Sequence, residues 1–171
     1  MNSQKCNCSN VIVVESVSEF NFEAKQKDIL LSAFSTSKQH IKNSNQFQPV
    51  TFDTLQINSG WSVNTFPNYS HPTNFIAQVN GWYLITYKIC VINCSTKWAT
   101  KLTINGNEIM GSASITKTLE AAADTTLVNL QKGDSIALLF WSNDSEAVIG
   151  TINSIPCPIK ETTAKILITK I

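Results

Sequence analysis

Short apolar runs separated by turn residues are the feature that most limits what this sequence can fold into. The runs recur from Leu30 to the C-terminus, and none of them carries the apolar stripe of a long helix. The predicted strands cover residues 31–35, 47–52, 75–79, 82–92, 98–104, 109–119, 125–130, 136–141, 147–152 and 164–171. Strands of this length and spacing predict an all-β protein of about ten strands, built as a sandwich, barrel or jelly roll.

Turn residues define the predicted connections. Asn80-Gly81 and Asn105-Gly106 each separate two apolar runs, and Asn-Gly in that setting is the strongest local signal for a β-hairpin. Residues 131–134 are predicted to form another tight turn, and residues 58–61 a further one. Residues 64–73 are polar and contain two prolines, so we expect a long loop there.

The predicted strands differ in how many apolar faces they have. Residues 82–92 alternate, with a fully apolar or aromatic face on one side and a face that includes Lys88 on the other. Residues 136–141 and 166–168 are apolar on both sides. An antiparallel strand normally keeps one face in water, so a loop or, more naturally, a subunit partner is expected to cover the second face. The residues assigned to the core or to a subunit interface are Tyr83, Ile85, Tyr87, Leu138, Phe140, Ile166 and Ile168.

Length and charge narrow the possible classes of protein. The 171 residues suggest one domain over residues 30–171, preceded by an extended tail over residues 1–29. Only 15% of the residues are charged and the net charge is +1, so nucleic acid is not an expected partner. The first ten residues lack a signal peptide's apolar segment, and no apolar run is long enough to cross a membrane. We therefore expect synthesis in a cytoplasm without export, and no membrane partner.

Five cysteines leave at least one thiol that is free or paired between chains. One interpretation is that they are buried or half-buried free thiols. The other is that the tail cross-links chains through intermolecular disulfides at Cys6 and Cys8. The cysteine spacing does not match a usual zinc site, so no metal is predicted.

The sequence holds no recognisable catalytic constellation. Its two histidines, His40 and His71, lie in loop-like surroundings, and there is no nucleophile elbow or phosphate-binding glycine loop. We therefore predict that the protein is not an enzyme and uses no cofactor. Trp61, Tyr69 and Trp98 are candidates for stacking on a ligand such as a sugar, and the alternative is that they fill the core or an interface.

Several motifs, taken in order, resemble the C1q/TNF-like jelly-roll superfamily. The Asn-Gly-Trp-Tyr segment, the Leu-Thr-Ile-Asn-Gly hairpin and the Leu-Gln-Lys-Gly-Asp turn each resemble a signature of that family, as does the closing strand. These motifs span residues 75–85, 102–106, 130–138 and 164–171. The resemblance implies an antiparallel jelly roll that forms a homotrimer.

Within that superfamily, residues 49–54 and 105–112 resemble the C-terminal domain of the collagen-like exosporium glycoprotein of Bacillus spores. The chain has only six glycines and no Gly-x-y repeat, so it looks more like the stalkless exosporium basal-layer proteins. That resemblance implies a structural protein of the spore surface, in exosporium or coat, whose tail contacts other spore-layer proteins. The alternative is a phage or surface binding module, a trimer that binds a receptor or carbohydrate.

Overall fold

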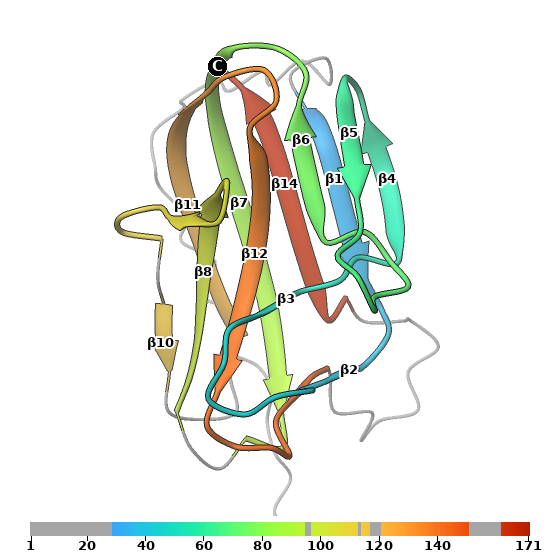
Figure 1. Ribbon diagram of the computed structural model, residues 1–171, viewed down its shortest axis with the longest axis vertical. Helices are drawn as coiled ribbons and strands as arrows, with labels where there is room; N and C mark the ends of the chain where they lie inside the picture. Colours follow the sequence, from blue (N-terminus) through green and yellow to red (C-terminus); the bar gives the residue numbers. More distant parts are fainter. Residues whose placement is uncertain (1–28, 95–96, 113, 117–120, 151–161) are drawn as a thin grey trace, which may run out of the picture.

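Two antiparallel β-sheets pack face to face in the computed structural model, which describes residues 29–94, 97–112, 114–116, 121–150 and 162–171 (Figure 1). The first, called the β7 sheet here, contains β1 (Ile29–Ser35), β2 (Gln39–His40), β4 (Thr54–Asn58), β7 (Gly81–Ile92), β11 (Ala121–Leu130), β13 (Val148–Ile149) and β14 (Ala164–Lys170). The second, the β12 sheet, contains β3 (Gln48–Pro49), β5 (Trp61–Asn64), β6 (Asn74–Ala77), β8 (Trp98–Ile104), β9 (Asn107–Glu108), β10 (Ser114–Thr116) and β12 (Ser135–Ser142).

The strand order shows how the chain is wound. The β7 sheet runs β2-β13-β7-β14-β1-β4, with β11 also paired to β7, and the β12 sheet runs β10-β8-β12-β6-β5, with β3 on β12 and β9 on β8. Successive long strands often lie in opposite sheets. The chain passes from β7 in one sheet to β8 in the other, and again from β11 to β12. Every pairing is antiparallel and the described residues contain no helix, so the predicted all-β antiparallel jelly roll is confirmed.

Four short strands, β2, β4, β5 and β9, were missed by the sequence pattern. Residues 58–61 were predicted only as a turn, but Ser59 and Gly60 connect two short strands, β4 and β5. Most of the side chains of β4 are exposed, and in β5 only Trp61 is buried. A strand with so little buried surface lacks the apolar alternation by which a strand is recognised.

The Asn105-Gly106 turn forms the predicted hairpin. Both residues have positive φ angles, 52° and 81°, and they join β8 directly to β9. The Asn105 amide also donates to Asp134 Oδ1 at 2.8 Å, and its oxygen accepts from the Ser135 amide at 2.9 Å. The turn is therefore attached to the start of β12 as well as closing its own hairpin.

The Asn80-Gly81 pair does not form the predicted hairpin. The strand before it, β6, pairs with β5 and β12, whereas β7 pairs with β11 and β14 in the other sheet. Asn80 does not have a positive φ, and its side-chain oxygen instead accepts from the Lys132 amide at 2.6 Å. The connection carries the chain from one sheet to the other, so the prediction that this turn fixes a hairpin register is wrong.

Aromatic side chains fill the space between the sheets. Trp61 meets Tyr83 edge-on with ring centroids 5.5 Å apart, and Trp98 lies 5.8 Å from Phe140. All seven residues assigned from sequence to the core or an interface are buried within the single chain: Tyr83, Ile85, Tyr87, Leu138, Phe140, Ile166 and Ile168.

The buried hydroxyl of Tyr87 is satisfied inside this core. It lies 3.0 Å from Thr100 Oγ1 and donates to the Ser112 carbonyl at 3.1 Å. Burial raises the pKa of Tyr87 and outweighs the hydrogen bond to Thr100, which lowers it. The phenol therefore stays neutral and bridges β7 to the segment that follows the β8–β9 hairpin.

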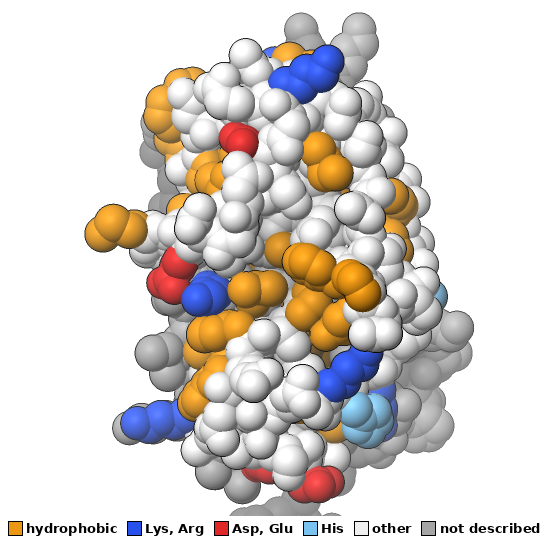
Figure 2. Space-filling model, in the orientation of Figure 1, with side chains coloured by type: hydrophobic (Ala, Val, Ile, Leu, Met, Phe, Trp, Pro, Cys, Tyr) orange, Lys and Arg blue, Asp and Glu red, His pale blue; other side chains and the backbone are white. Residues whose placement is uncertain are grey.

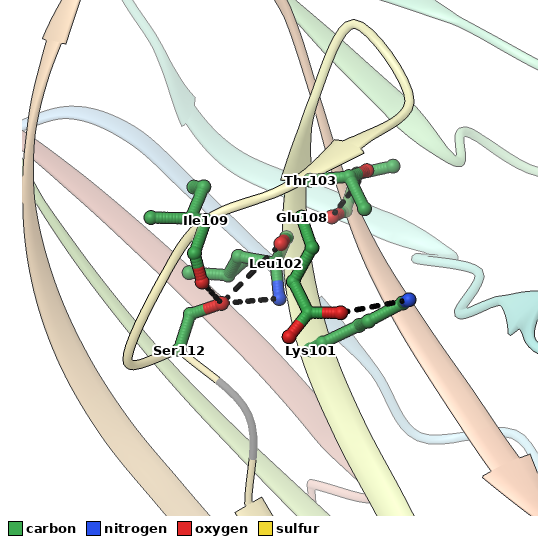
Figure 3. A network of polar contacts seen from close by, with 7 residues as sticks. Lys101, Leu102, Thr103, Glu108, Ile109 and Ser112 are labelled. Atoms are coloured by element: carbon green, nitrogen blue, oxygen red, sulfur yellow. Dashed lines mark hydrogen bonds and ion pairs between the residues drawn. The ribbon is translucent and has the colours of Figure 1, made fainter.

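The side chain of Ser112 also holds this segment in place (Figure 3). Its buried hydroxyl accepts from the Leu102 amide at 3.1 Å and donates to the Ile109 carbonyl at 2.7 Å. On the surface of the hairpin, Lys101 Nζ and Glu108 Oε2 form an ion pair at 3.0 Å. The chain after the hairpin is thus held against β8 without a regular strand pairing.

Candidate assembly surface

The outer face of the β12 sheet is partly covered by loops of the same chain. The loop between β2 and β3 (residues 41–47, the covering loop) passes in front of β8 and β12 in Figure 1, and the Asn45 amide donates to the Ser142 carbonyl at 2.8 Å. Phe47, in the covering loop, has its ring 4.1 Å from Lys101 Nζ on β8. Lys101 is paired with Leu139 across the strands, and Leu139 is half-buried.

Phe66 extends this cover. It lines a small cavity together with Leu139, and hydrophobic side chains gather at the centre of this face in Figure 2. A loop or, more naturally, a subunit partner was expected to cover the second face of residues 136–141, and within this chain loops lie over part of it. Loops of the same chain supply much of that cover, because they carry phenylalanines over the strand.

The outer face of the β7 sheet lacks such a cover within the described part of the chain. Trp82 is 52% exposed, Leu84 36% and Leu127 53%. Leu84 and Leu127 are directly opposite each other in the β7–β11 pairing, so they form one apolar ridge. The surface called the bare face here consists of Trp82, Leu84, Thr86, Thr125, Leu127, Leu167 and Thr169.

Charge is confined to one end of this surface. None of the bare-face residues is charged, and Thr86 and Thr125 place their hydroxyl oxygens 3.1 Å apart. Beyond them, Lys88 lies directly opposite Lys165 in the β7–β14 pairing. In the described residues neither lysine has a carboxylate within ion-pair distance, since the ion pair there joins Lys101 to Glu108. Like charges directly opposite each other repel, so this end of the surface is less suited to burial than the bare face.

The three residues proposed to stack on a ligand differ in how deeply the structure buries them. Trp61 is 6% exposed and Trp98 0%, so their rings pack in the core and cannot meet a ligand from solvent. The proposed role is wrong for both, because Trp61 packs edge-on against Tyr83 of the opposite sheet and Trp98 packs beside Phe140 of its own sheet within the core. Tyr69 is half-buried beside Lys42, whose Nζ lies 3.9 Å from the centre of its ring.

The cysteines described by the structure lie at the end of β7. Cys94 is buried with its sulfur 3.5 Å from Ser142 Oγ, and Cys90 is half-buried with its sulfur 3.9 Å from the Thr162 carbonyl. β7 ends at Ile92 and Asn93 has a φ of 55°, so the two cysteines do not share one extended strand. Cys6 and Cys8, with almost all of the predicted tail, lie outside the described residues, and their cross-link stays a prediction.

In the part of the chain that the structure describes, no group of three or more His, Cys, Asp or Glu residues could hold a metal ion. No helix in that part is long and apolar enough to span a membrane.

Comparison with solved structures supports the fold. Murine APRIL at pH 5.0 aligns with a TM-score of 0.57 and 8% identity, covering 83% of this chain and 98% of that chain. The globular domain of zebrafish complement 1qA protein aligns with a TM-score of 0.51 and 12% identity, covering 82% and 95% of the two chains. A search of curated proteins finds no match to this sequence.

Domains of the C1q/TNF-like fold are typically non-enzymatic modules that form homotrimers and serve in binding or structure. The resemblance seen in the ordered sequence motifs agrees with the family comparison. The family model described as the C1q domain matches residues 33–153, which is most of the sandwich. This chain belongs to the C1q domain family.

Proposed function

We propose that this protein is a non-catalytic structural subunit of a bacterial spore surface layer, assembled as a homotrimer through the bare face. The bare face is the observation that carries the proposal. It places exposed side chains on β7 and β11 and half-buried ones on the adjacent β14, all apolar or neutral, in a domain whose family commonly trimerises. A contiguous apolar surface of this kind marks a site of protein association.

The chemistry of the bare face suits a lasting subunit contact. Trp82, Leu84 and Leu127 are large side chains that are 52%, 36% and 53% exposed, and burying the exposed part of one of them stabilises an interface by roughly 1 kcal/mol. The hydroxyl groups of their neighbours Thr86 and Thr125 already lie 3.1 Å apart, so they keep a hydrogen bond when the face is buried. Charged residues are depleted at the centre of stable interfaces, as they are here.

The spore-surface assignment rests on the bacterial resemblance of residues 49–54 and 105–112. A protective layer needs subunits that associate permanently, and a chain with only 15% charged residues suits the burial of surface between subunits. Intermolecular disulfides at Cys6 and Cys8 would then join trimers to each other or to other spore-layer proteins.

Measurement of the solution mass tests the assembly. Light scattering coupled to size exclusion is expected to give about three times the 18.9 kDa chain mass. The double variant Leu84→Asp with Leu127→Asp should reduce it to one chain, because charge on the ridge cannot be buried unpaired. The matched control is Val63→Asp on β5, since Val63 is 37% exposed but belongs to the other sheet. A monomeric wild-type protein, or equal dissociation by the control, contradicts the assembly.

Localisation tests the spore assignment separately. Antibody labelling of intact spores, together with mass spectrometry of washed spore surface fractions, is expected to detect the protein. Its absence from spores of the source organism contradicts the assignment. Its presence in phage particles instead would favour the alternative binding module.

A further inference from the structure

A cavity of about 280 Å³ lies away from the bare face, between β2, β3 and the loop that precedes β6. Segments distant in sequence build it, and lysine and histidine side chains gather near β2 at the lower right of Figure 2. Its charged and ionisable lining residues are Lys38, His40, Lys42, Tyr69 and His71. Sequence reasoning treated the two histidines as unrelated loop residues, and the fold brings both to one cavity.

Lys42 is already positioned at the cavity. Its ammonium group donates to the Asn68 carbonyl at 2.8 Å and lies 3.9 Å from the centre of the Tyr69 ring. An ammonium group has three donors, so it can still give hydrogen bonds to a ligand. Burial raises the pKa of Tyr69, and the phenol therefore remains a neutral hydrogen-bond donor.

Side-chain hydrogen bonds fix the walls of the cavity. Gln39 binds both backbone groups of Thr51, accepting from its amide at 2.8 Å and donating to its carbonyl at 2.9 Å. The Gln48 oxygen accepts from the backbone amide of Lys42 at 2.9 Å. These contacts join β2 to the β3 segment on both sides of the cavity, so the site is formed before a ligand arrives.

The charge around the cavity has one sign. Two lysines and two histidines line it, and none of its described lining residues carries a carboxylate. Asp53 lies next to this group, but its Oδ2 already accepts from the amides of Thr36 and Ser37. Buried Phe140 and Ile149 provide apolar lining. Cationic groups at the rim of a preformed, partly apolar cavity suit a small ligand with an anionic group.

We propose that this cavity binds a small organic anion of about monosaccharide size, whose carboxylate or phosphate group contacts Lys42 and Lys38. The site is complete within one chain, so it is independent of the proposed trimer. Lysine binds such groups as a point charge, so either anion is accepted. The neutral donors of Asn68, Ser70 and Tyr69 would contact the ligand's hydroxyl groups.

Binding of matched sugars tests the proposal. Glucuronate and glucose 6-phosphate are titrated into the full chain, with glucose as the uncharged control, and amide chemical shifts are followed by NMR. Both anions are expected to shift the amides of residues 37–42 and 68–71, and glucose is not. Comparable shifts with glucose, or anion-induced shifts confined to other residues, would overturn the proposal, as would no binding at all.

Charge-removing variants locate the site. Lys42→Gln and Lys38→Gln should each weaken anion binding about tenfold or more, because a charge-assisted hydrogen bond is lost. Lys132→Gln is the matched control, since Lys132 is an exposed lysine in the turn before β12 and does not line the cavity. Thermal unfolding of each variant checks that the fold is intact. Equal weakening by the control, or no weakening by either cavity variant, contradicts the assignment.

Discussion

The two sheets of this sandwich have outer faces of opposite character. On the β12 sheet, loops of the same chain bring Phe47 against Lys101 of β8 and Phe66 beside Leu139 of β12. On the β7 sheet, Trp82, Leu84 and Leu127 project from the strands with no described loop over them. Both sheets thus carry apolar residues outward, but only one supplies its own cover.

This difference shows where association is needed. An apolar strand in an antiparallel sheet does not by itself predict a partner, because a long connection can fold back over it. Here the connection between β2 and β3 does so for β12. The covering phenylalanines are still 41% and 40% exposed, but the β7 sheet differs in that its strands present large apolar side chains directly, and this is why the bare face is the candidate assembly surface.

The largest expected effect is the difference in stability loss between substitutions on the inner side and on the outer side of β12. Phe140→Ala should lower the free energy of unfolding by about 3–5 kcal/mol, because Phe140 is buried between the sheets. Leu139→Ala, on the outer side of the same strand, should cost about 1–2 kcal/mol, because Leu139 is only half-buried. Urea unfolding measures both. Equal losses would show that the covering loop seals the outer face as completely as the core.

An intermediate effect concerns how the covered side is attached to β1. Asp53 follows β3 and joins it to the turn after β1, accepting from Ser35 Oγ at 3.1 Å and from the Thr36 amide at 3.0 Å. Burial raises the pKa of Asp53, but the hydrogen bonds from Thr36, Ser37, Thr54 and Ser35 outweigh it and lower the pKa to about 2. The ionised form of the Asp53 side chain is therefore favoured more strongly in the folded chain than in the unfolded chain.

The sign of the pH dependence follows from that lowered pKa. Stability from Asp53 is present above the unfolded pKa of 3.8 and is lost as the pH falls toward about 2. Asp53→Asn should remove about 1–2 kcal/mol at pH 7, after allowance for solvent screening, and flatten the unfolding profile between pH 4 and pH 2. Urea unfolding at several pH values measures this. An unchanged acid profile in the variant would contradict the role of Asp53.

Local sequence patterns predicted much of the fold. The alternation in β7 placed Tyr83, Ile85 and Tyr87 on one face, and the structure buries all three. The patterns failed where strand pairing depends on residues that are distant in the sequence. Asn80-Gly81 has the composition of a hairpin, but β6 and β7 find their partners in different sheets, so the pair became a crossover. No local signal distinguishes these two outcomes.

The candidate surface was only half predictable. The sequence placed Trp82, Leu84 and Lys88 on the second face of their strand, and that face is exposed at all three positions. Leu127 could not be added, because its position beside Leu84 depends on the β7–β11 register. The cavity lined by His40 and His71 was unpredictable for the same reason, since long-range packing alone brings their loops together.

The smallest expected effect tests how the covering loop is held on the β12 sheet. Glu108→Gln removes the ion pair with Lys101 and should cost less than about 0.5 kcal/mol, because Glu108 is about half exposed. Lys101→Met keeps an apolar stem but removes the ion pair and the contact with the Phe47 ring, so we expect a loss larger by about 0.5–1 kcal/mol. Urea unfolding at low and high salt separates the two, because salt screens the exposed ion pair.

The difference between these two variants measures the contact that fixes the cover. A larger loss for Lys101→Met means that Phe47 attaches the covering loop to β8. Equal losses would mean that Phe47 contributes nothing there, and the attachment would then rest on the hydrogen bond from Asn45 to Ser142. In that case the covered face would be closer in character to the bare face, and Phe47 and Phe66 would become a second candidate surface for association.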